Sequence, residues 1–523
     1  MLRAARPAAA LVLVLVTACG DNDPAPPDAG PSSPDASTAA CTDLADPVPT
    51  GILTTVSDVP ALPGSAAGGL VELAPDVWFV RSDPVSGFGY AYPRVGSSCA
   101  DGLTVTNNDY TWSDGTIGFA RRGVSGQGFE FARAAAVCLG QDGLLRYAER
   151  VCFQPAGEAL ECRDSVAGTG TRYPVLGEQG RNVTLVASDE FDAAAFDVDI
   201  RGDVAYVAVD GGVRAYDLSN PAAMPLLGVL DLPGSFTIND IEVVEFAGRR
   251  TAYVSDDATL VIDVTDPTAM VALGTVDNSG RDPYSHTVQV GLRGGVPHLY
   301  LGGQAGIPVY SLANPVSPLH VGTIALTQEG THDMTVDGTR IYVNNEFGGF
   351  VTVDATSLTT PVEGARRNGT FYDHASAVGT SGARRLVIHG GEGLEEDGRG
   401  THLRVFDGDP GSATFMQQLG EFATRAETGI HNMQLRDGVA YVAYYHDGFR
   451  MIDLTDPASP VELGHYNTWD RARGNGGAFD GAIGIDLAAD GSVVLVNYGG
   501  SVMRLRPTPR RPRGAPAPSV VLR

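Results

Sequence analysis

Two short phrases recur along the second half of the chain, and their spacing constrains the fold more than any other feature of the sequence. One phrase ends in proline and reads LVIDVTDP at 260–267 and MIDLTDP at 451–457, with weaker copies ending at Pro221, Pro315, Pro361 and Pro410. The other is a short strand that precedes it, such as AYVAV at 205–209. The strand phrase occurs seven times. Its period of roughly 45 residues is that of a four-stranded propeller blade.

One copy shows how a blade is predicted to form. Between residues 431 and 466, four runs rich in aliphatic, aromatic and β-branched residues alternate with turns of Gly, Asp or Pro. This pattern is typical of an antiparallel meander. Proline cannot donate a hydrogen bond to a sheet, so the Asp-Pro phrase is predicted to end the third strand. Sheets packed radially bury faces that a single meander would expose.

The last copy, residues 482–507, has no fourth strand of its own, because a Pro- and Arg-rich tail at 508–523 follows its third strand. The segment 181–190, RNVTLVASDE, matches the fourth-strand position and precedes the first inner strand. We therefore predict an all-β fold, a seven-bladed β-propeller over residues 181–507. Closure by this N-terminal strand would remove an open sheet edge.

The phrase LVIDVTDP resembles the repeat of the LVIVD-repeat family of bacterial surface and secreted β-propeller lipoproteins. The resemblance covers about residues 181–507. It implies a propeller fold. It implies no particular activity, because one fold hosts many functions.

The first residues read as an export signal. Residues 1–18 combine Arg3 and Arg6 with an apolar run, and VTAC ending at Cys19 is typical of a bacterial lipobox. Cys19 is therefore the predicted lipidation site and membrane anchor, followed by a Pro-, Asp- and Ser-rich tether over 19–40. The alternatives are a signal peptide cut elsewhere and a membrane span, for which the apolar run is short.

The expected location is the bacterial cell envelope. Gly20 stands where an aspartate would hold an enteric lipoprotein at the inner membrane. The outer membrane is thus favoured, with the protein facing outward or into the periplasm. A formal charge of -26 and a pI near 4.6 argue against nucleic acid as a partner.

The remaining cysteines mark a separate region. Cys41, Cys99, Cys138, Cys152 and Cys162 all lie in one segment, and none follows it. In an exported chain this predicts a small, disulfide-containing, β-rich module over 41–180. Cys152 and Cys162 flank a hairpin-sized loop and are the favoured pair, with Cys99 and Cys138 second. Zinc binding is the alternative, although the segment has no CxxC pair.

Aligning the copies on the strand phrase places one column of residues just before each innermost strand. In chain order the column reads Phe196, Asn239, His286, His332, His374, His431 and Ile483. Four consecutive blades, the third to the sixth, thus place a histidine at the same position. Because the innermost strands of a propeller start at one face around the axis, we expect these four imidazoles to converge.

This column predicts a site for one transition-metal ion, with Fe, Cu or Zn as the ions that imidazole suits. Asp333, Asn432, Glu346 and Glu392 are the expected acceptors behind the ligands. Four-histidine iron on a propeller axis also occurs in carotenoid oxygenases, a likeness of fold alone. In the alternative, each histidine hydrogen-bonds the turn between blades as a repeat feature. Asn239 in the same column supports that alternative.

Two further segments give weaker indications. Residues 277–282, DNSGRD, have the oxygen-rich composition of a calcium loop but lack the distal glutamate. A turn is the alternative there. The fifth blade carries a long polar insertion with His389, Glu392 and His402, which predicts either a recognition edge or a solvated acidic loop. No catalytic residue is assigned, since GxSxG, HExxH and phosphate-loop motifs are absent.

Two functions remain after these observations. In the first, the protein is a surface-anchored lipoprotein whose propeller binds a protein or glycan ligand, as an adhesion or scaffold module. In the second, it is a metal-dependent enzyme, similar to an oxidoreductase, with the four-histidine site on its axis.

Overall fold

A computed structural model describes the strands 117–124, 130–139, 145–154 and 161–170 by their backbone. It further describes residues 179–508, with gaps at 234–237, 278–283, 304–305, 328–329, 347, 365, 368–371, 393–401, 425–427 and 470–479. All regular elements in these residues are β-strands. Accordingly, none of them is a helix long and apolar enough to cross a membrane.

The N-terminal strands form one antiparallel meander, in a compact unit separate from the propeller. They are β1 (Ile117–Val124), β2 (Glu130–Leu139), β3 (Leu145–Gln154) and β4 (Glu161–Gly170). The register of β3 and β4 places Cys152 opposite Cys162. Cys19, Cys41 and Cys99 lie outside the described residues, and both disulfides stay predictions.

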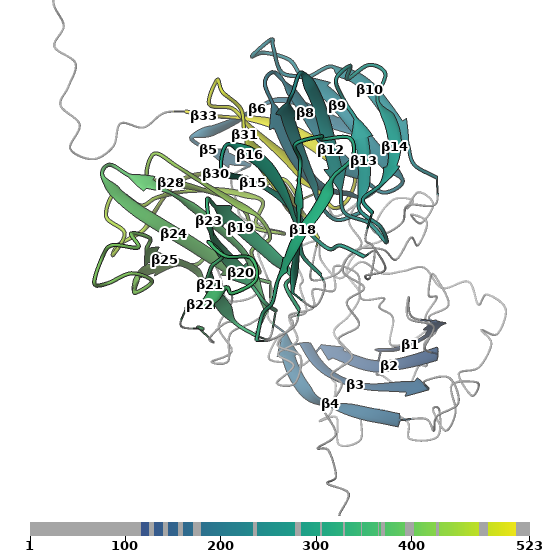
Figure 1. The fold of residues 1–523 in the computed structure, drawn as a ribbon. Helices are drawn as coiled ribbons and strands as arrows, with labels where there is room; N and C mark the ends of the chain where they lie inside the picture. The colour runs from purple at the N-terminus through teal and green to yellow at the C-terminus, as the bar shows by residue number, and fades with distance from the viewer. Residues whose placement is uncertain are drawn as a thin grey trace, which may run out of the picture. The chain divides into compact units, whose positions relative to one another are not determined.

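The second unit is a seven-bladed propeller, as the sequence predicts, and Figure 1 shows its sheets. Blade 1 contains β7 (Ala195–Arg201), β8 (Val204–Val209), β9 (Gly212–Asp217) and β10 (Leu226–Asp231). Blade 2 contains β11 (Ile241–Phe246), β12 (Arg249–Val254), β13 (Leu260–Asp263) and β14 (Val271–Thr275). Blade 3 contains β15 (Val288–Arg293), β16 (Val296–Leu301), β17 (Ile307–Ser311) and β18 (Leu319–Ile324).

The remaining blades repeat this order. Blade 4 contains β19 (Asp333–Asp337), β20 (Arg340–Asn344), β21 (Phe350–Asp354) and β22 (Val362–Glu363). Blade 5 contains β23 (Asp373–Ser381), β24 (Arg384–Gly391), β25 (Leu403–Asp407) and β26 (Gln418–Phe422). Blade 6 contains β27 (Met433–Arg436), β28 (Val439–Ala443), β29 (Phe449–Asp453) and β30 (Val461–Tyr466). Blade 7 contains β31 (Ala482–Leu487), β32 (Val493–Asn497) and β33 (Ser501–Pro507).

Two short strands precede blade 1 in the chain and pair with the last two blades. β5 (Gly180–Arg181) pairs with β30 of blade 6, and β6 (Val183–Glu190) pairs antiparallel with β33 as the outer strand of blade 7. Asn182 joins them in a left-handed conformation, with φ 56°. Each innermost strand contacts its two neighbours, and the ring returns from β31 to β7.

The two recurring phrases meet across blades, which explains why they recur together. Tyr206 of blade 1 donates its hydroxyl to the carbonyl of Val264, 3.1 Å away in the Asp-Pro turn of blade 2. Tyr253 of blade 2 does the same to Pro315 of blade 3 at 2.7 Å. Within the turn, the Asp266 carboxylate accepts the N–H of Thr268 at 2.9 Å. A buried hydroxyl needs a partner, and the turn phrase supplies one.

Carboxylates on the innermost strands of blades 7, 1 and 2 hold the next blade in the same way. Asp486 accepts the N–H of Ile200 at 2.8 Å, and Asp240 accepts that of Val288 at 2.8 Å. Asp199 accepts the N–H of Val243 at 2.5 Å. These carboxylates accept from backbone N–H groups that have no partner in the strand pairing of their own blade.

Candidate metal centre

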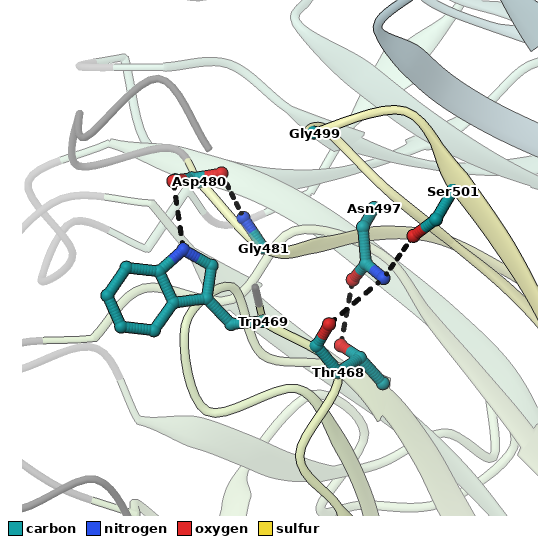
Figure 2. Close-up of a pocket in the computed structure, with 7 residues that line it drawn as sticks. All are labelled: Thr468, Trp469, Asp480, Gly481, Asn497, Gly499 and Ser501. Carbon is teal, nitrogen blue, oxygen red and sulfur yellow. Dashed lines mark hydrogen bonds between the residues drawn. The ribbon is translucent and has the colours of Figure 1, made fainter. Parts of the chain in front are cut away.

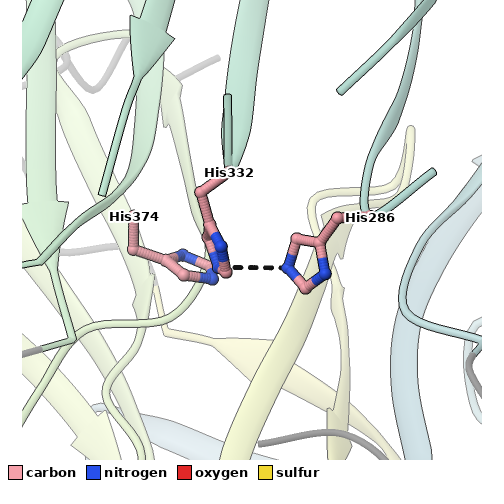
Figure 3. Close-up of side chains that lie close together, drawn as sticks. All are labelled: His286, His332 and His374. Atoms are coloured by element: carbon pink, nitrogen blue, oxygen red, sulfur yellow. Dashed lines mark hydrogen bonds between the residues drawn. The ribbon is translucent and has the colours of Figure 1, made fainter. Parts of the chain in front are cut away.

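The four histidines of the column come together near the ring axis. Nε2 of His286 lies 3.0 Å from Nε2 of His332, and their ring centres are 4.0 Å apart. The ring centres of His332 and His374 are 4.6 Å apart, and those of His374 and His431 are 4.2 Å apart. Figure 3 shows the first three rings side by side. The slot before each innermost strand thus brings imidazoles from four consecutive blades into one cluster.

Two of these histidines have their tautomer set by the next blade. Nδ1 of His374 lies 3.0 Å from the carbonyl oxygen of His431, and Nδ1 of His431 lies 3.1 Å from that of Ile483. A carbonyl accepts only from an N–H, so Nδ1 is the protonated nitrogen in both rings. Nε2 then carries a lone pair. This arrangement is the one in which histidine ligates a metal ion.

The other two histidines contact tyrosines. The hydroxyl of Tyr284 lies 3.3 Å from Nδ1 of His286, and that of Tyr372 lies 3.3 Å from Nδ1 of His332. The Glu346 carboxylate also lies 3.4 Å from Nδ1 of His332. With both Nδ1 atoms turned toward hydroxyl or carboxylate oxygens, their Nε2 atoms face each other. At 3.0 Å the two Nε2 atoms form a hydrogen bond in which one ring donates to the other, and a metal ion between them would take the place of that proton.

Carboxylates and a tyrosine complete the cluster. Glu392 has Oε1 3.6 Å from Nε2 of His374 and 3.8 Å from Nε2 of His431. Tyr445 donates its hydroxyl to the same carboxylate. Glu346 and Tyr445 have φ of 43° and 34°. Such a conformation is unfavourable for residues other than glycine, and its occurrence at two residues around one cluster is typical of a functional site.

Burial dominates the electrostatics of the cluster. It lowers the pKa of His286 to about 4 and that of His431 to about 3, and it lowers the pKa of His332 and His374 well below the usual value. Burial also raises the pKa of Glu392 to about 8. The imidazoles are therefore neutral at pH 7. Neutral imidazole is the form that ligates a metal.

The ligand atoms fall into two overlapping groups. Those of His286, His332 and His374 lie within 4.8 Å of one another, and so do those of His374, Glu392 and His431. Imidazole nitrogen and carboxylate oxygen are ligands of first-row transition metals. The residues present therefore fit such an ion, and His374 belongs to both groups.

The four acceptors expected behind the histidines are placed differently. Glu346 and Glu392 face the rings. Asn432 interacts with His431 and also donates to Asp197 at 3.2 Å, and Asp333 accepts from Thr287 at 3.1 Å. These two side chains contribute to contacts between innermost strands.

The residues named for a recognition edge are placed inside the blade. His389 has a side chain 2% exposed, 2.9 Å from Asp373, and Glu392 has a side chain 4% exposed. His402 lies 3.4 Å from Glu421 with its side chain 11% exposed. The insertion itself, 393–401, lies outside the described residues, as does most of the calcium-loop segment. Both interpretations therefore stay predictions.

Sequence reasoning missed the tyrosines of the centre. Tyr284 and Tyr372 each precede a histidine of the cluster by two residues, so a Tyr-x-His pattern in blades 3 and 5 was the available signal. Tyr445 follows β28 at the position that Glu346 holds after β20. A second aligned column, two residues after the second strand of each blade, would have indicated Tyr445 together with Glu346.

A small pocket between blades 6 and 7 has a different character. Figure 2 shows Trp469 donating to Asp480 at 2.9 Å, and Thr468 and Ser501 hydrogen-bonded to Asn497 at 2.7 and 2.9 Å. Its polar groups are engaged with one another. This is the arrangement of a structural hydrogen-bond network.

Comparisons with known proteins concern the fold. The family model of the LVIVD repeat matches residues 193–231 and 432–468, which correspond to blades 1 and 6. No curated protein sequence matches the chain. The WD40 β-propeller domain of Doa1 is 12% identical, with 62% of this chain and 96% of that chain covered and a TM-score of 0.44. Streptogramin B lyase is 10% identical, with 61% and 97% covered and a TM-score of 0.44. The chain is a seven-bladed β-propeller that contains LVIVD repeats.

Proposed function

We propose that this propeller is a metalloprotein of the bacterial cell envelope, which holds one transition-metal ion through His286, His332, His374 and His431. One observation carries the proposal. Imidazoles from four consecutive blades converge. In His374 and His431 a carbonyl of the next blade accepts the hydrogen bond from Nδ1–H, which leaves the Nε2 lone pair for a ligand. A histidine with a purely structural role would need only the hydrogen bond from Nδ1, and its Nε2 would not have to face the other histidines.

The test is the metal content of the purified full chain. We expect about one equivalent of iron, copper or zinc after dialysis, and recovery of that stoichiometry when the stripped protein is titrated with each ion. Chelation followed by reloading controls for adventitious ions. A wild-type protein that retains no ion beyond that of a His332→Ala, His374→Ala double variant would overturn the proposal.

An iron or copper ion in this centre would support redox chemistry of the oxidoreductase type. The exposure of Glu346 supports this extension, because that side chain is 37% exposed while His332, which it contacts, is buried. Oxygen uptake by the loaded protein, with ascorbate as reductant, would test it. If the loaded protein takes up oxygen no faster than the free ion does, the ion has a binding role and not a redox role.

Anchoring through a lipid on Cys19 is the second part of the proposal. It is supported by the lipobox VTAC at 16–19 and by the polar tether behind it. Replacing Cys19 with alanine should move the protein out of the membrane fraction, because the lipid supplies the anchor. An unchanged distribution would overturn this part. The disulfides of the 41–180 module, Cys152 with Cys162 first, belong to the same exported state.

A binding or scaffold role for a protein or glycan ligand is the second candidate. Propellers with LVIVD repeats offer binding surfaces. The outer strands carry recurring exposed aliphatic residues, among them Val271 at 53% and Leu319 at 68% exposed. Exposed apolar surface of this kind marks contact sites. Binding of envelope glycans or proteins to the metal-free protein would favour this role over a metal-dependent one.

A further inference from the structure

Glu392 brings a carboxylate in among the histidines. Its Oε1 faces Nε2 of His374 and of His431 at 3.6 and 3.8 Å, and its Oε2 lies 3.9 Å from Nε2 of His332. Its side chain is only 4% exposed. Within the described residues its ion-pair contacts are all with histidines, and no arginine or lysine is among them. A buried carboxylate is costly unless a cation or several donors compensate it.

The distances place Glu392 in one ligand group with His374 and His431, and His374 joins this group to that of His286 and His332. Two ligand atoms that are each about 2.1 Å from one ion lie about 3.0 Å apart at a right angle and at most about 4.2 Å apart. The Nε2 atoms of His286 and His332 are 3.0 Å apart. The separations between Glu392 and the other histidines, 3.6 to 3.9 Å, also fall inside the limit. Glu392 thus stands at a distance from His332, His374 and His431 that allows it to share an ion with them.

We infer that Glu392 is a fifth ligand of the ion, an inference that rests on the metal site proposed above and requires the two overlapping ligand groups to draw together around the ion. Four neutral imidazoles leave the charge of a divalent ion uncompensated, and this carboxylate supplies one negative charge at the ion itself. Five protein ligands exceed the four that structural zinc takes. The centre therefore suits an ion that accepts five or six ligands, iron(II) in particular, with a remaining position for water or a small ligand.

Tyr445 positions this carboxylate. Its hydroxyl donates to Oε1 of Glu392, and its ring lies against His431 with centres 5.4 Å apart. Tyr445 sits in the left-handed region at φ 34°, and Ala482 of blade 7 pairs with it in an isolated bridge. The strained backbone thus aims the hydroxyl at the carboxylate. Tyr445 is a positioning residue, since it touches the ligand and not the ion.

The test compares Glu392→Gln with wild type, and Glu245→Gln serves as control because that carboxylate is on the surface of blade 2. Cobalt(II) is the probe, since its visible absorption weakens as coordination rises from four to five. We expect Glu392→Gln to lower cobalt affinity at least about tenfold and to strengthen the absorption. Added acetate should restore affinity to Glu392→Ala, by filling the vacated position. Tyr445→Phe should lower affinity less than Glu392→Gln.

The outcomes separate this inference from the metal site. If wild type binds cobalt and Glu392→Gln matches it in affinity and absorption, Glu392 is no ligand and the histidine site stands. If wild type binds no ion, the site itself fails. X-ray absorption of the cobalt-loaded wild type needs no substitution. A first shell of four nitrogens would overturn the inference, whereas five or more nitrogen and oxygen ligands, including a carboxylate, would support it.

Discussion

The two halves of the ring carry different chemistry along their innermost strands. In blades 7, 1 and 2 the inner strands carry carboxylates, and in blades 3 to 6 the column carries histidines. Both kinds of side chain bond to the next blade: Asp486 accepts from Ile200 at 2.8 Å, and His431 donates to Ile483 at 3.1 Å. Bonds to the neighbouring blade are therefore made in both halves, by different side chains at different positions of the inner strand.

The two halves differ in which side-chain atoms remain available for a ligand once the bond to the next blade is made. Each histidine has a second nitrogen, and these nitrogens face one another. The carboxylates instead accept hydrogen bonds from backbone and hydroxyl donors. In Asp240 both oxygens do so, with the N–H groups of Val288 and Ile241 and the hydroxyl of Thr287 as donors. Nitrogen atoms that face one another and are not committed to backbone groups can bind a ligand. The acidic half is accordingly expected to govern stability, and the histidine half to govern metal affinity.

Removing the strand that completes blade 7 should have the largest effect. A chain beginning at residue 192 lacks β5 and β6 and exposes the edge of β33. We expect a loss comparable with the whole stability of a domain, about 5–15 kcal/mol. A chain beginning at residue 179 keeps both strands and is the matched control. Thermal unfolding followed by circular dichroism measures the difference, and equal midpoints would show that ring stability does not depend on β6.

Replacing one histidine should separate affinity from stability. His374 belongs to both ligand groups, so His374→Ala should lower metal affinity on the order of 100-fold or more. Asn239→Ala changes the same slot in the acidic half and should leave affinity unchanged. Competition with a chromophoric chelator gives both values. Similar losses in the two variants would mean that the column acts on metal binding only through the fold.

The repeat made the fold predictable, and it made the histidine column predictable too. Aligned copies share one backbone, so residues at one slot must lie around one axis. His286, His332, His374 and His431 could therefore be placed together without any knowledge of side-chain contacts. The pairing of β6 with β33 likewise follows from a blade with one strand too few.

The rest of the centre depends on features that a linear sequence does not show. Tyr372 reaches His332 of the preceding blade, a contact fixed by the rotation between blades. Tyr445 and Glu346 adopt left-handed backbone conformations that their residue types disfavour. His389 lies in an apparently polar run, yet it stacks on Phe350 with ring centres 4.4 Å apart. The sequence pattern around it predicts a loop surface, because polar residues are mostly exposed.

The two halves should respond to pH in opposite directions. Burial and the neighbouring Asp199 raise the pKa of Asp486 to about 7, and burial raises the pKa of Glu242 well above its usual value. Above about pH 4 the unfolded chain loses these protons first, so the folded state binds more protons. The contribution of these carboxylates to the free energy of unfolding should therefore fall, on the order of 3 kcal/mol, as pH rises from about 4 to about 7, whereas the buried histidines with lowered pKa contribute in the opposite direction.

Urea unfolding of the metal-free protein between pH 4 and 8 checks this slope, and Asp486→Asn should flatten it. Metal affinity in the histidine half should instead fall toward acid, because protons compete for imidazole. A pH dependence of the unfolding free energy that is the same in wild type and Asp486→Asn would contradict the assignment of a stabilising role to protonated carboxylates in the acidic half.

A single carboxylate of the acidic half should have the smallest effect. Asp240→Ala leaves the buried N–H of Val288 without its acceptor at 2.8 Å, which costs about 1–2 kcal/mol of unfolding free energy. The loss is limited because the Asp240 charge also raises the pKa of Asp197, and its removal relieves that repulsion. Asp231→Ala on exposed β10 should stay within about 0.5 kcal/mol of wild type. Metal affinity should match wild type in both variants. A drop in affinity for Asp240→Ala, with stability unchanged, would mean that the acidic half governs metal binding rather than stability.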